Sequence, residues 1–435
     1  MTDVTMDKIV SLAKRRGFIY PGSELYGGLS GTWDYGPLGV EMKNNVKQIW
    51  WRMFVQDRED MCGLDAAILM NPEVWKASGH VQGFSDPLVE CVKCKRRFRA
   101  DQVGDACPEC GGAFGEVRQF NMMFKTQVGA AEDEGSISYL RPETAGGIFG
   151  NFKNVVDSLH PKLPFGIAQI GKAFRNEIAP RDFIFRVREM EQMEIEYFVK
   201  PDDWQTSFEE WRKHVGAFFA SVGVDMNSVH ELDVASEDLA HYSKRTIDFE
   251  FDFPFGRKEL SGLAYRTDFD LQAHSKGSGT ELSIIVDDAT GEKLIPHVIE
   301  PSFGVDRTVL AILASAYTED EVGGEVRTYL KFNKAVAPIK AAIFPLLKNK
   351  PELVAKAREI YVSLKKDIPQ IMWDDNGNIG KRYRRQDEIG TPVCITVDFD
   401  TLGENPELAD TVTVRDRDTG AQERVSISEL KARIS

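Results

Sequence analysis

Residues 174–194 concentrate arginines and carboxylates at spacings that suit nucleotide binding. Arg175 and Glu177 follow an apolar segment, residues 165–170, that is typical of a strand, and alternate residues of a strand face the same side. A guanidinium group binds phosphate through paired, charge-assisted hydrogen bonds, and a neighbouring carboxylate can accept a hydrogen bond from the amino group of adenine. Residues 185–194 are expected to return as a second, charged strand. The pattern therefore predicts a nucleotide site built on a sheet rather than on a loop.

A phosphate-binding loop is suggested only superficially by residues 166–172. They match G-x-x-x-x-G-K, but the next residue is Ala173, where a P-loop needs Ser or Thr to hold Mg²⁺. We interpret the match as coincidental. A nucleotide site without a P-loop must bind phosphates and metal with arginines and carboxylates, which this chain supplies.

Four cysteines occur as two C-x-x-C pairs with twelve residues between them. They are Cys91, Cys94, Cys107 and Cys110. Four thiolates at this spacing can surround Zn²⁺ tetrahedrally and leave no open position, which predicts a structural zinc site; unrelated pairs or disulfides are the alternative. Cys62 and Cys394 lie in apolar contexts and are expected to be core residues.

Composition and charge bound the class of protein. The chain has 435 residues, 42% hydrophobic and 28% charged, which is normal for globular domains. No apolar run reaches the length of a membrane span, and the N-terminus lacks a signal-peptide pattern, so a cytoplasmic protein without membrane contact is expected. The net charge of −14 argues against non-specific coating of nucleic acid. Three basic clusters, at residues 14–16, 93–99 and 381–385, still allow local binding of an anionic polymer.

The residue pattern suggests two main domains. Residues 1–330 are expected to form a catalytic domain, which contains the zinc knuckle at 90–116 and a helical insertion at 202–245. Apolar residues recur at helical spacing at the start of that insertion. Residues 335–435 alternate strand and helix patterns, which predicts a separate α/β domain.

Several strings resemble those of a known enzyme family. Residues 33–51, 174–193 and 304–307 resemble motifs 1, 2 and 3 of class II aminoacyl-tRNA synthetases. The strings at 141–145, 265–270, 300–304 and 377–383 are similar to those of homodimeric glycyl-tRNA synthetases. The likeness runs nearly end to end.

The resemblance implies an α+β fold, in which an antiparallel sheet flanked by helices is followed by a C-terminal α/β anticodon-binding domain. It implies a glycine–tRNA ligase, which activates glycine with ATP to glycyl-adenylate and transfers glycine to the 3′ end of tRNA(Gly) in protein synthesis. It also implies Mg²⁺ and a homodimer formed through motif 1.

The resemblance assigns roles in ATP binding and catalysis. Arg175 is expected to hold the α-phosphate, Arg307 the γ-phosphate, and Glu177 the adenine amine, and Glu259 is expected to bind Mg²⁺ because hard cations prefer carboxylate oxygen. The implied ATP-binding residues are Arg175, Asn176, Glu177, Phe185, Arg186, Val187, Arg188, Glu189, Met190, Glu259, Leu260, Gly304, Val305, Asp306 and Arg307.

Glycine offers no side chain to grip, so its ammonium group and the space around its α-carbon must be recognised. Glu143, Glu300 and Ser302 match ammonium-binding positions, and Arg266 matches a contact on the carboxylate side. The implied glycine-binding residues are Arg99, Glu143, Met190, Glu191, Gln192, Met193, Glu194, Arg266, Glu300, Ser302 and Gly304. One departure is Gly146, where the family usually has Gln.

The basic cluster of the C-terminal domain is the candidate tRNA contact. It comprises Lys381, Arg382, Tyr383, Arg384 and Arg385. The basic residues would bind phosphates and Tyr383 would stack on an unpaired base, whereas a solvated loop is the alternative.

Two other functions were weighed. A non-catalytic nucleic-acid-binding relative would be expected to lose the arginines of motifs 2 and 3, but Arg175 and Arg307 are present. A synthetase for another small amino acid is disfavoured by the glycine-type strings. His80 and His297 form no pair at metal spacing and are expected to be structural.

Overall fold

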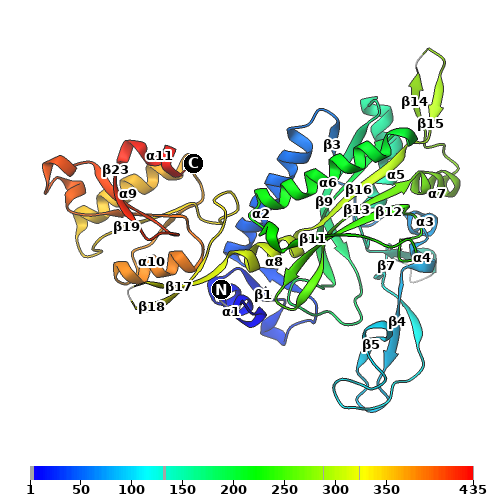
Figure 1. Ribbon diagram of the computed structural model, residues 1–435, viewed down its shortest axis with the longest axis horizontal. Coiled ribbons are helices and arrows are strands. Elements are labelled where there is room, and N and C mark those ends of the chain that lie inside the picture. Colours follow the sequence, from blue (N-terminus) through cyan, green and yellow to red (C-terminus); the bar gives the residue numbers. More distant parts are fainter. Residues whose placement is uncertain (1–3, 131–133, 288, 323, 435) are drawn as a thin grey trace.

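The structure is a computed structural model that describes residues 4–130, 134–287, 289–322 and 324–434. Figure 1 shows a large N-terminal body, a smaller C-terminal body, and an arm that carries β4 and β5 away from the large one. Within the described residues, no helix combines the length and apolar character needed to cross a membrane.

A seven-stranded sheet forms the centre of the large body. Its strands, in spatial order, are β11 (Val229–Asp233), β12 (Arg245–Phe253), β13 (Gly256–Thr267), β16 (His297–Gly304), β10 (Glu189–Val199), β9 (Phe165–Phe174) and β3 (Met61–Gly63). All neighbours are antiparallel except β3, which runs parallel to β9 at the edge. The expected antiparallel sheet is therefore confirmed.

Helices cover both faces of this sheet. The helices of the large body are α1 (Met6–Arg16), α2 (Pro37–Trp51), α3 (Pro72–Ala77), α4 (His80–Gly83), α5 (Ala145–Leu159), α6 (Trp204–Ser221), α7 (Phe269–Ser278) and α8 (Val305–Ala316). Helices α2, α6 and α8 pack in the main hydrophobic core on one face, and α5 and α7 pack in a second core on the other.

Strand β10 shows why the site lies on the α5 and α7 face. Its alternate residues Met193, Ile195 and Tyr197 enter the main core with α2, α6 and α8. Glu194 and Glu196 must then point to the opposite face, because successive strand side chains alternate. Both glutamates are buried, so this face of the sheet carries carboxylates in its interior.

The predicted helical insertion at residues 202–245 is only partly helical. Helix α6 occupies its first half, and its Trp211 and Phe218 are buried in the main core. Strand β11 lies in the second half and forms an edge of the main sheet. A partly exposed edge strand with polar residues has little apolar alternation, which is why the sequence pattern did not reveal it.

Short strands complete the large body. Strand β1 (Ile19–Pro21) pairs with β2 (Trp33–Tyr35), and the arm has a sheet of β4 (Ser85–Glu90), β5 (Arg97–Arg99) and β6 (Arg118–Asn121). Two further pairs are β7 (Lys125–Gln127) with β8 (Ile137–Tyr139), and β14 (Ile284–Asp287) with β15 (Glu292–Leu294).

The C-terminal body has the expected mixed α/β architecture. Its sheet has the order β20 (Ile371–Trp373), β19 (Ala341–Pro345), β21 (Val393–Val397), β22 (Thr411–Asp416) and β23 (Gln422–Ser426). Helices α9 (Pro351–Lys365), α10 (Ile379–Glu388) and α11 (Leu430–Ile434) belong to the same body.

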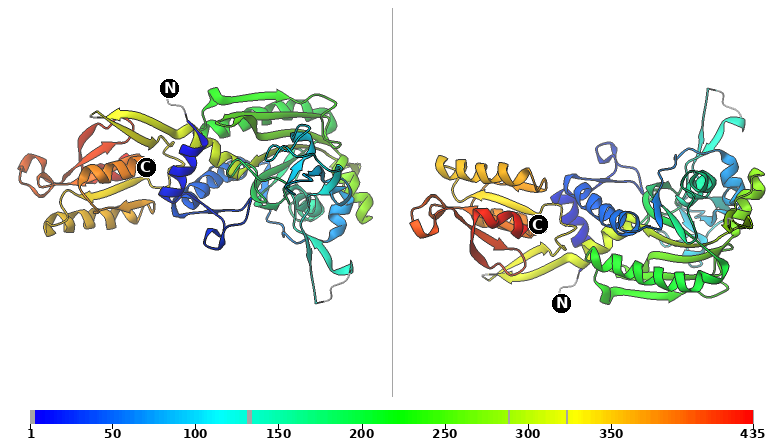
Figure 2. Two further views of the ribbon diagram at one scale, coloured as in Figure 1. Left: turned by 90° about the horizontal axis from the view of Figure 1, so that it is seen from below. Right: turned by 90° about the horizontal axis from the view of Figure 1, so that it is seen from above.

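A hairpin of β17 (Tyr317–Val322) and β18 (Glu325–Leu330) lies between the two bodies (Figure 2). Arg327 of β18 donates to Asp320 of β17 at 2.8 Å and to Asp387 of α10 at 3.2 Å. Arg415 of β22 donates to the same Asp387 at 2.7 Å. The buried Arg327–Asp387 pair therefore links the hairpin to the C-terminal body.

Candidate active site

A cavity of about 250 Å³ lies beside the ends of β9, β10, β13 and β16. Its lining contains predicted residues from the motif 2 and motif 3 regions and from segments outside the motifs, which are Arg99, Arg175, Glu177, Phe185, Arg186, Val187, Met190, Glu191, Gln192, Glu259, Leu260, Ser302, Gly304, Asp306 and Arg307. Met122, Ile184 and Ser261 also line it and were not predicted as site residues. The structure therefore gathers in one cavity residues that are up to 208 positions apart, from Arg99 to Arg307.

Arg175 is held at the end of β9. Its backbone N–H donates to the Arg188 carbonyl at 2.9 Å, and its Nε donates to the Pro142 carbonyl at 3.1 Å. The guanidinium carbon lies 5.4 Å from the centre of the Phe84 ring. These contacts fix the direction in which the guanidinium group faces the cavity.

Glu177 provides a buried acceptor in the same cavity. It is 9% exposed, and its Oε2 has no hydrogen-bond partner within the described residues. Burial raises the pKa of this carboxyl, and the charges of Arg186 and Arg175 oppose that rise. A buried acceptor without a donor is costly, so the site suits a ligand that supplies an N–H group.

Arg307 reaches the cavity from the first turn of α8. Its Nη1 donates to the Glu259 carbonyl at 3.0 Å and lies 3.2 Å from the Glu259 carboxylate. Its guanidinium carbon stacks 4.4 Å from the centre of the Phe185 ring. The neighbouring Asp306 is used differently, because it accepts from the Tyr35 hydroxyl at 2.6 Å and from the Glu191 backbone N–H at 2.9 Å.

Two further motif 2 arginines, Arg186 and Arg188, have separate positions. Arg186 lines the cavity and donates to Gln102 Oε1 at 3.2 Å. Arg188 instead donates to the carbonyls of Glu177, at 3.0 Å, and Ser30, at 2.5 Å. Arg188 thus braces the segment that carries Glu177.

Carboxylates gather near Arg307. Burial and the facing charge of Glu259 raise the pKa of Asp248 to about 6, and Glu250 adds to the effect. The Glu259 side chain is half-exposed. A hard divalent cation at Glu259 would relieve this repulsion, so the donor set fits Mg²⁺.

The predicted glycine residues form a second, more buried layer. Glu194 accepts hydrogen bonds from the Thr144 backbone N–H at 3.1 Å and from Ser302 Oγ at 2.9 Å. Ser302 is therefore oriented by Glu194. The backbone carbonyl of Ser302 accepts a hydrogen bond from Ser261 Oγ at 2.7 Å.

Arg266, the predicted contact on the carboxylate side of glycine, is paired with two buried carboxylates. It is 2% exposed, and all three guanidinium nitrogens donate to carboxylates: Nε and Nη2 to Asp270, at 2.7 and 2.8 Å, and Nη1 to Glu300, at 2.7 Å. The Tyr242 ring lies 3.8 Å from its guanidinium carbon. Arg266 thus positions Glu300, a relation that short sequence strings do not show.

The carboxyl groups of this layer differ in their protonation. Burial opposes ionisation of Glu143, but the charge facing it from His80 lowers its pKa to about 2. Burial raises the pKa of Glu300 to about 8, despite Arg266. Burial also raises the pKa of Glu196 well above its usual value, and neither of its carboxyl oxygens has a partner within the described residues. One carboxylate, Glu143, therefore carries a stable negative charge at neutral pH.

Four other predicted residues have different surroundings. Asn176 donates its backbone N–H to the Met122 carbonyl, and Glu189 pairs with Lys172 at the surface. Met193 and Val305 are buried in the main core. None of these four lines the cavity. His80 and Asp270 were not predicted as site residues, although Asp270 ends the 265–270 string that resembles the family and lies four residues after Arg266.

The four predicted cysteines meet at the tip of the arm. Their sulfurs all lie within 4.8 Å of one another, with Cys91–Cys110 at 3.5 Å and Cys94–Cys107 at 3.7 Å. Tetrahedral Zn²⁺ with bonds of about 2.3 Å requires sulfur separations of about 3.8 Å. The backbone N–H of Cys94, which faces Cys91 Sγ at 3.5 Å, lowers the pKa of the Cys91 thiol to about 6. The arrangement fits a structural zinc ion.

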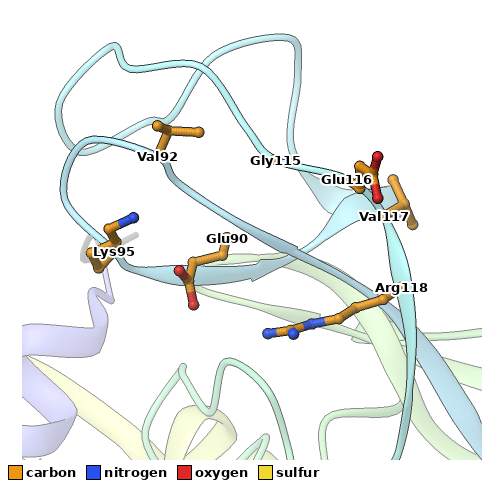
Figure 3. A pocket seen from close by; sticks show the side chains of 7 residues that line it. All are labelled: Glu90, Val92, Lys95, Gly115, Glu116, Val117 and Arg118. Atoms are coloured by element: carbon orange, nitrogen blue, oxygen red, sulfur yellow. The ribbon is translucent and has the colours of Figure 1, made fainter.

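The arm also connects to the active-site cavity. Arg99, at the end of β5, lines that cavity and pairs with Asp86 of β4 at 2.6 Å. A separate cavity of about 350 Å³ lies on the arm itself, where Glu90, Lys95 and Arg118 surround it (Figure 3). This second cavity contains none of the predicted ATP or glycine residues.

The basic cluster of the C-terminal body falls on α10, and its five residues differ in exposure. Arg382 is 1% exposed and donates to the backbone carbonyls of Gly377 and Asp375. Tyr383 is half-buried, with its hydroxyl 2.7 Å from Thr396 Oγ1, and Arg385 pairs with Asp374. Lys381 and Arg384 are the exposed members. The structure thus gives Arg382 a structural role that its sequence context did not indicate.

Comparison with known proteins gives a consistent picture. The family model described as the tRNA synthetase class II core domain (G, H, P, S and T) matches residues 124–316, and that of the anticodon binding domain matches residues 340–435. The chain is 51% identical to the glycine–tRNA ligase of Caldanaerobacter subterraneus subsp. tengcongensis, over 98% of this chain and 97% of that one. It is 52% identical to the same enzyme of Clostridium tetani (99% and 98% covered) and 50% identical to that of Thermobifida fusca (98% and 96%).

Proposed function

The chain belongs to the class II glycine–tRNA ligases, and from this membership we propose how its own residues carry out the reaction. In the first step the carboxylate of glycine attacks the α-phosphorus of ATP, which releases pyrophosphate and forms glycyl-adenylate. A terminal hydroxyl of tRNA(Gly) then attacks the carbonyl carbon and AMP leaves. Both steps depend on positioning and charge neutralisation more than on a protein nucleophile.

We propose that the cavity of about 250 Å³ binds ATP between two arginines. Arg175 would neutralise charge at the α-phosphate, where the new bond forms, and Arg307 would hold the γ-phosphate from the α8 side. Glu177 would accept from the adenine amine. The single observation that carries this proposal is the buried Oε2 of Glu177, which has no donor within the described residues although it lies in a cavity with both arginines.

Glu259 is the proposed Mg²⁺ ligand. The ion would neutralise phosphate charge when bound, and Glu259 would exchange its pairing with Arg307 for coordination. The repulsion that raises the pKa of Asp248 to about 6 supports a cation near these carboxylates.

The glycine ammonium is proposed to bind between Glu143 and the Ser302 hydroxyl, near Glu300. Glu143 supplies the stable negative charge, while Ser302 is oriented by Glu194. Arg266 acts by holding Glu300 rather than by touching glycine. Rejection of larger amino acids must be steric, because one methylene group changes binding by only about 1–3 kcal/mol.

Replacing Glu177 tests the nucleotide assignment. Glu177→Ala is expected to weaken binding of a non-hydrolysable glycyl-adenylate analogue about 10- to 100-fold, because a charged acceptor for the adenine amine is lost. Isothermal titration calorimetry measures this change. Glu237→Ala, at an exposed carboxylate elsewhere, serves as the control. Equal affinity of the Glu177 variant and the wild type would contradict the assignment.

The four-cysteine cluster is proposed to hold structural Zn²⁺. Cys107→Ser should lower the metal content from one zinc per chain toward zero and loosen the arm, because a structural zinc site supplies folding energy. Atomic absorption and hydrogen exchange of residues 90–116 measure both effects. Cys62→Ser is the control, since Cys62 lies outside the cluster. Full zinc content in the Cys107 variant would rule out the site.

We also propose that Lys381 and Arg384, the exposed part of the basic cluster, contact tRNA phosphates. Tyr383 and Arg385 would then support α10 through their contacts with Thr396 and Asp374. We further propose a cytoplasmic homodimer in which motif 1, residues 33–51 with helix α2, meets a second copy.

A further inference from the structure

His80 stands beside the glycine layer and has a fixed orientation. It opens α4, where its Nδ1 lies 2.8 Å from Ser78 Oγ and its Nε2 lies 3.4 Å from Glu143 Oε2. Its ring is held between those of Trp75 and Phe84, each with centres 5.4 Å away. The side chain is only 14% exposed.

Gly146 helps to fix this arrangement. A Cβ atom at this position would lie 2.7 Å from the Trp75 ring, so the glycine leaves room for the indole that packs against His80. The departure from the family's usual Gln therefore has a local consequence: the wall behind His80 is aromatic and close-packed.

The hydrogen bonds of His80 determine whether the ring nitrogen nearest Glu143, Nε2, carries a hydrogen. If the Ser78 hydroxyl donates to Nδ1, the neutral imidazole carries its hydrogen on Nε2. If Ser78 instead donates to the Trp75 carbonyl, which lies 3.4 Å away, Nδ1 carries a hydrogen. An unprotonated Nε2 would then face a carboxylate, so the ring must be an imidazolium. In both cases Nε2 carries a hydrogen and lies 3.4 Å from Glu143 Oε2.

We propose that His80, oriented by Ser78, is a positioning residue that clamps one oxygen of Glu143 and turns the other toward the ammonium group of glycine. This inference rests on the proposed function, since it deepens the role of Glu143. His80 does not touch the reacting atoms. It acts by keeping the ammonium-binding carboxylate charged and in one orientation.

The charged surroundings of Glu143 show why such a clamp is needed. The titratable groups that face it are His80, Arg266, Arg175, Glu300, Tyr242 and His274. Arg266 is already paired with Asp270 and Glu300. Among the lowering influences on the Glu143 pKa, the charge of His80 is the largest. Without His80, burial would favour a protonated Glu143 that cannot attract an ammonium ion.

The test compares His80→Phe with His80→Gln in ATP–pyrophosphate exchange between pH 6 and 8.5. His80→Phe keeps the aromatic packing but removes the N–H group, and is expected to raise the KM for glycine at least about 10-fold, with the KM for ATP within about twofold. The defect should grow as the pH falls, because the Glu143 pKa has risen. His80→Gln, which restores an N–H donor, should recover most of the affinity. His297→Gln, whose partner is Tyr265, is the control and should leave the KM for glycine unchanged.

Several outcomes would overturn the inference. One is an unchanged KM for glycine in His80→Phe; another is an equal loss in the Phe and Gln variants with no pH dependence, which is the result of a merely structural role. If His80→Phe does not fold, Ser78→Ala decides: a rise of several-fold in the KM for glycine supports the clamp, and no rise overturns it. Lack of glycine-dependent exchange in the wild type would instead refute the proposed function itself.

Discussion

Arg175→Ala is expected to lower glycine-dependent ATP–pyrophosphate exchange by about 10³-fold, the effect of removing a positioned charge from a transition state for acyl or phosphoryl transfer. Negative charge grows around the α-phosphorus as the glycine carboxylate attacks, and Arg175 is aimed into the cavity by its bond to the Pro142 carbonyl. The loss should appear mainly in kcat, because the charge being stabilised is greatest in the transition state.

The fold should tolerate this change. Arg175 is half-buried and loses one protein hydrogen bond, worth about 1 kcal/mol. The thermal midpoint should therefore stay within a few degrees of the wild-type value. Arg212→Ala, which removes a surface arginine paired with Glu209 and Glu231, is the control and should retain full exchange. Exchange within tenfold of wild type in Arg175→Ala would refute the assigned role.

Arg266→Ala is expected to lower the free energy of unfolding by about 3–5 kcal/mol, because it leaves buried carboxylates without their partner. Asp270 and Glu300 are 3% and 7% exposed and depend on this guanidinium group. Denaturant unfolding at two pH values measures the effect. The destabilisation should be larger at pH 8 than at pH 5.5, because at lower pH the buried carboxyl groups can take up protons in the folded state.

The sign of this pH dependence separates two roles for Arg266. The pKa of Glu300 is already raised to about 8, above the value of about 4.3 in an unfolded chain. Ionisation of such a group favours the unfolded state, so stability is lost as the pH rises toward 8. Removal of Arg266 should steepen that loss. A variant with wild-type stability at both pH values would show that Arg266 is free to bind substrate, contrary to the contacts described above.

Most of the proposed nucleotide site could be predicted from the sequence because its residues occur in short contiguous strings. Arg175 and Glu177 were indicated by strand alternation after the segment that forms β9, whereas Arg307, in the first turn of α8, was indicated by the resemblance to motif 3. The four-cysteine cluster could also be predicted, since tetrahedral coordination of a metal ion imposes the C-x-x-C spacing. The antiparallel sheet itself followed from the family resemblance.

The rest depended on contacts between distant segments. His80 lies 63 positions from Glu143, and neither residue type nor spacing indicates that they meet. Arg266 was read as a substrate contact, because the sequence cannot show that Asp270 and Glu300 occupy all of its nitrogens. Arg382 was read as a tRNA contact, although its neighbours on α10 turn it toward buried carbonyls.

The most direct measurement is ATP–pyrophosphate exchange by the purified chain with glycine, alanine or serine, each with and without tRNA(Gly). The account predicts exchange with glycine alone, because in the proposed site Glu143 and Ser302 would bind the ammonium group and a side chain on the α-carbon would be rejected sterically. Equal or faster exchange with alanine or serine would contradict the glycine pocket, and no exchange with glycine even when tRNA is present would contradict the assignment of the cavity as the site of activation.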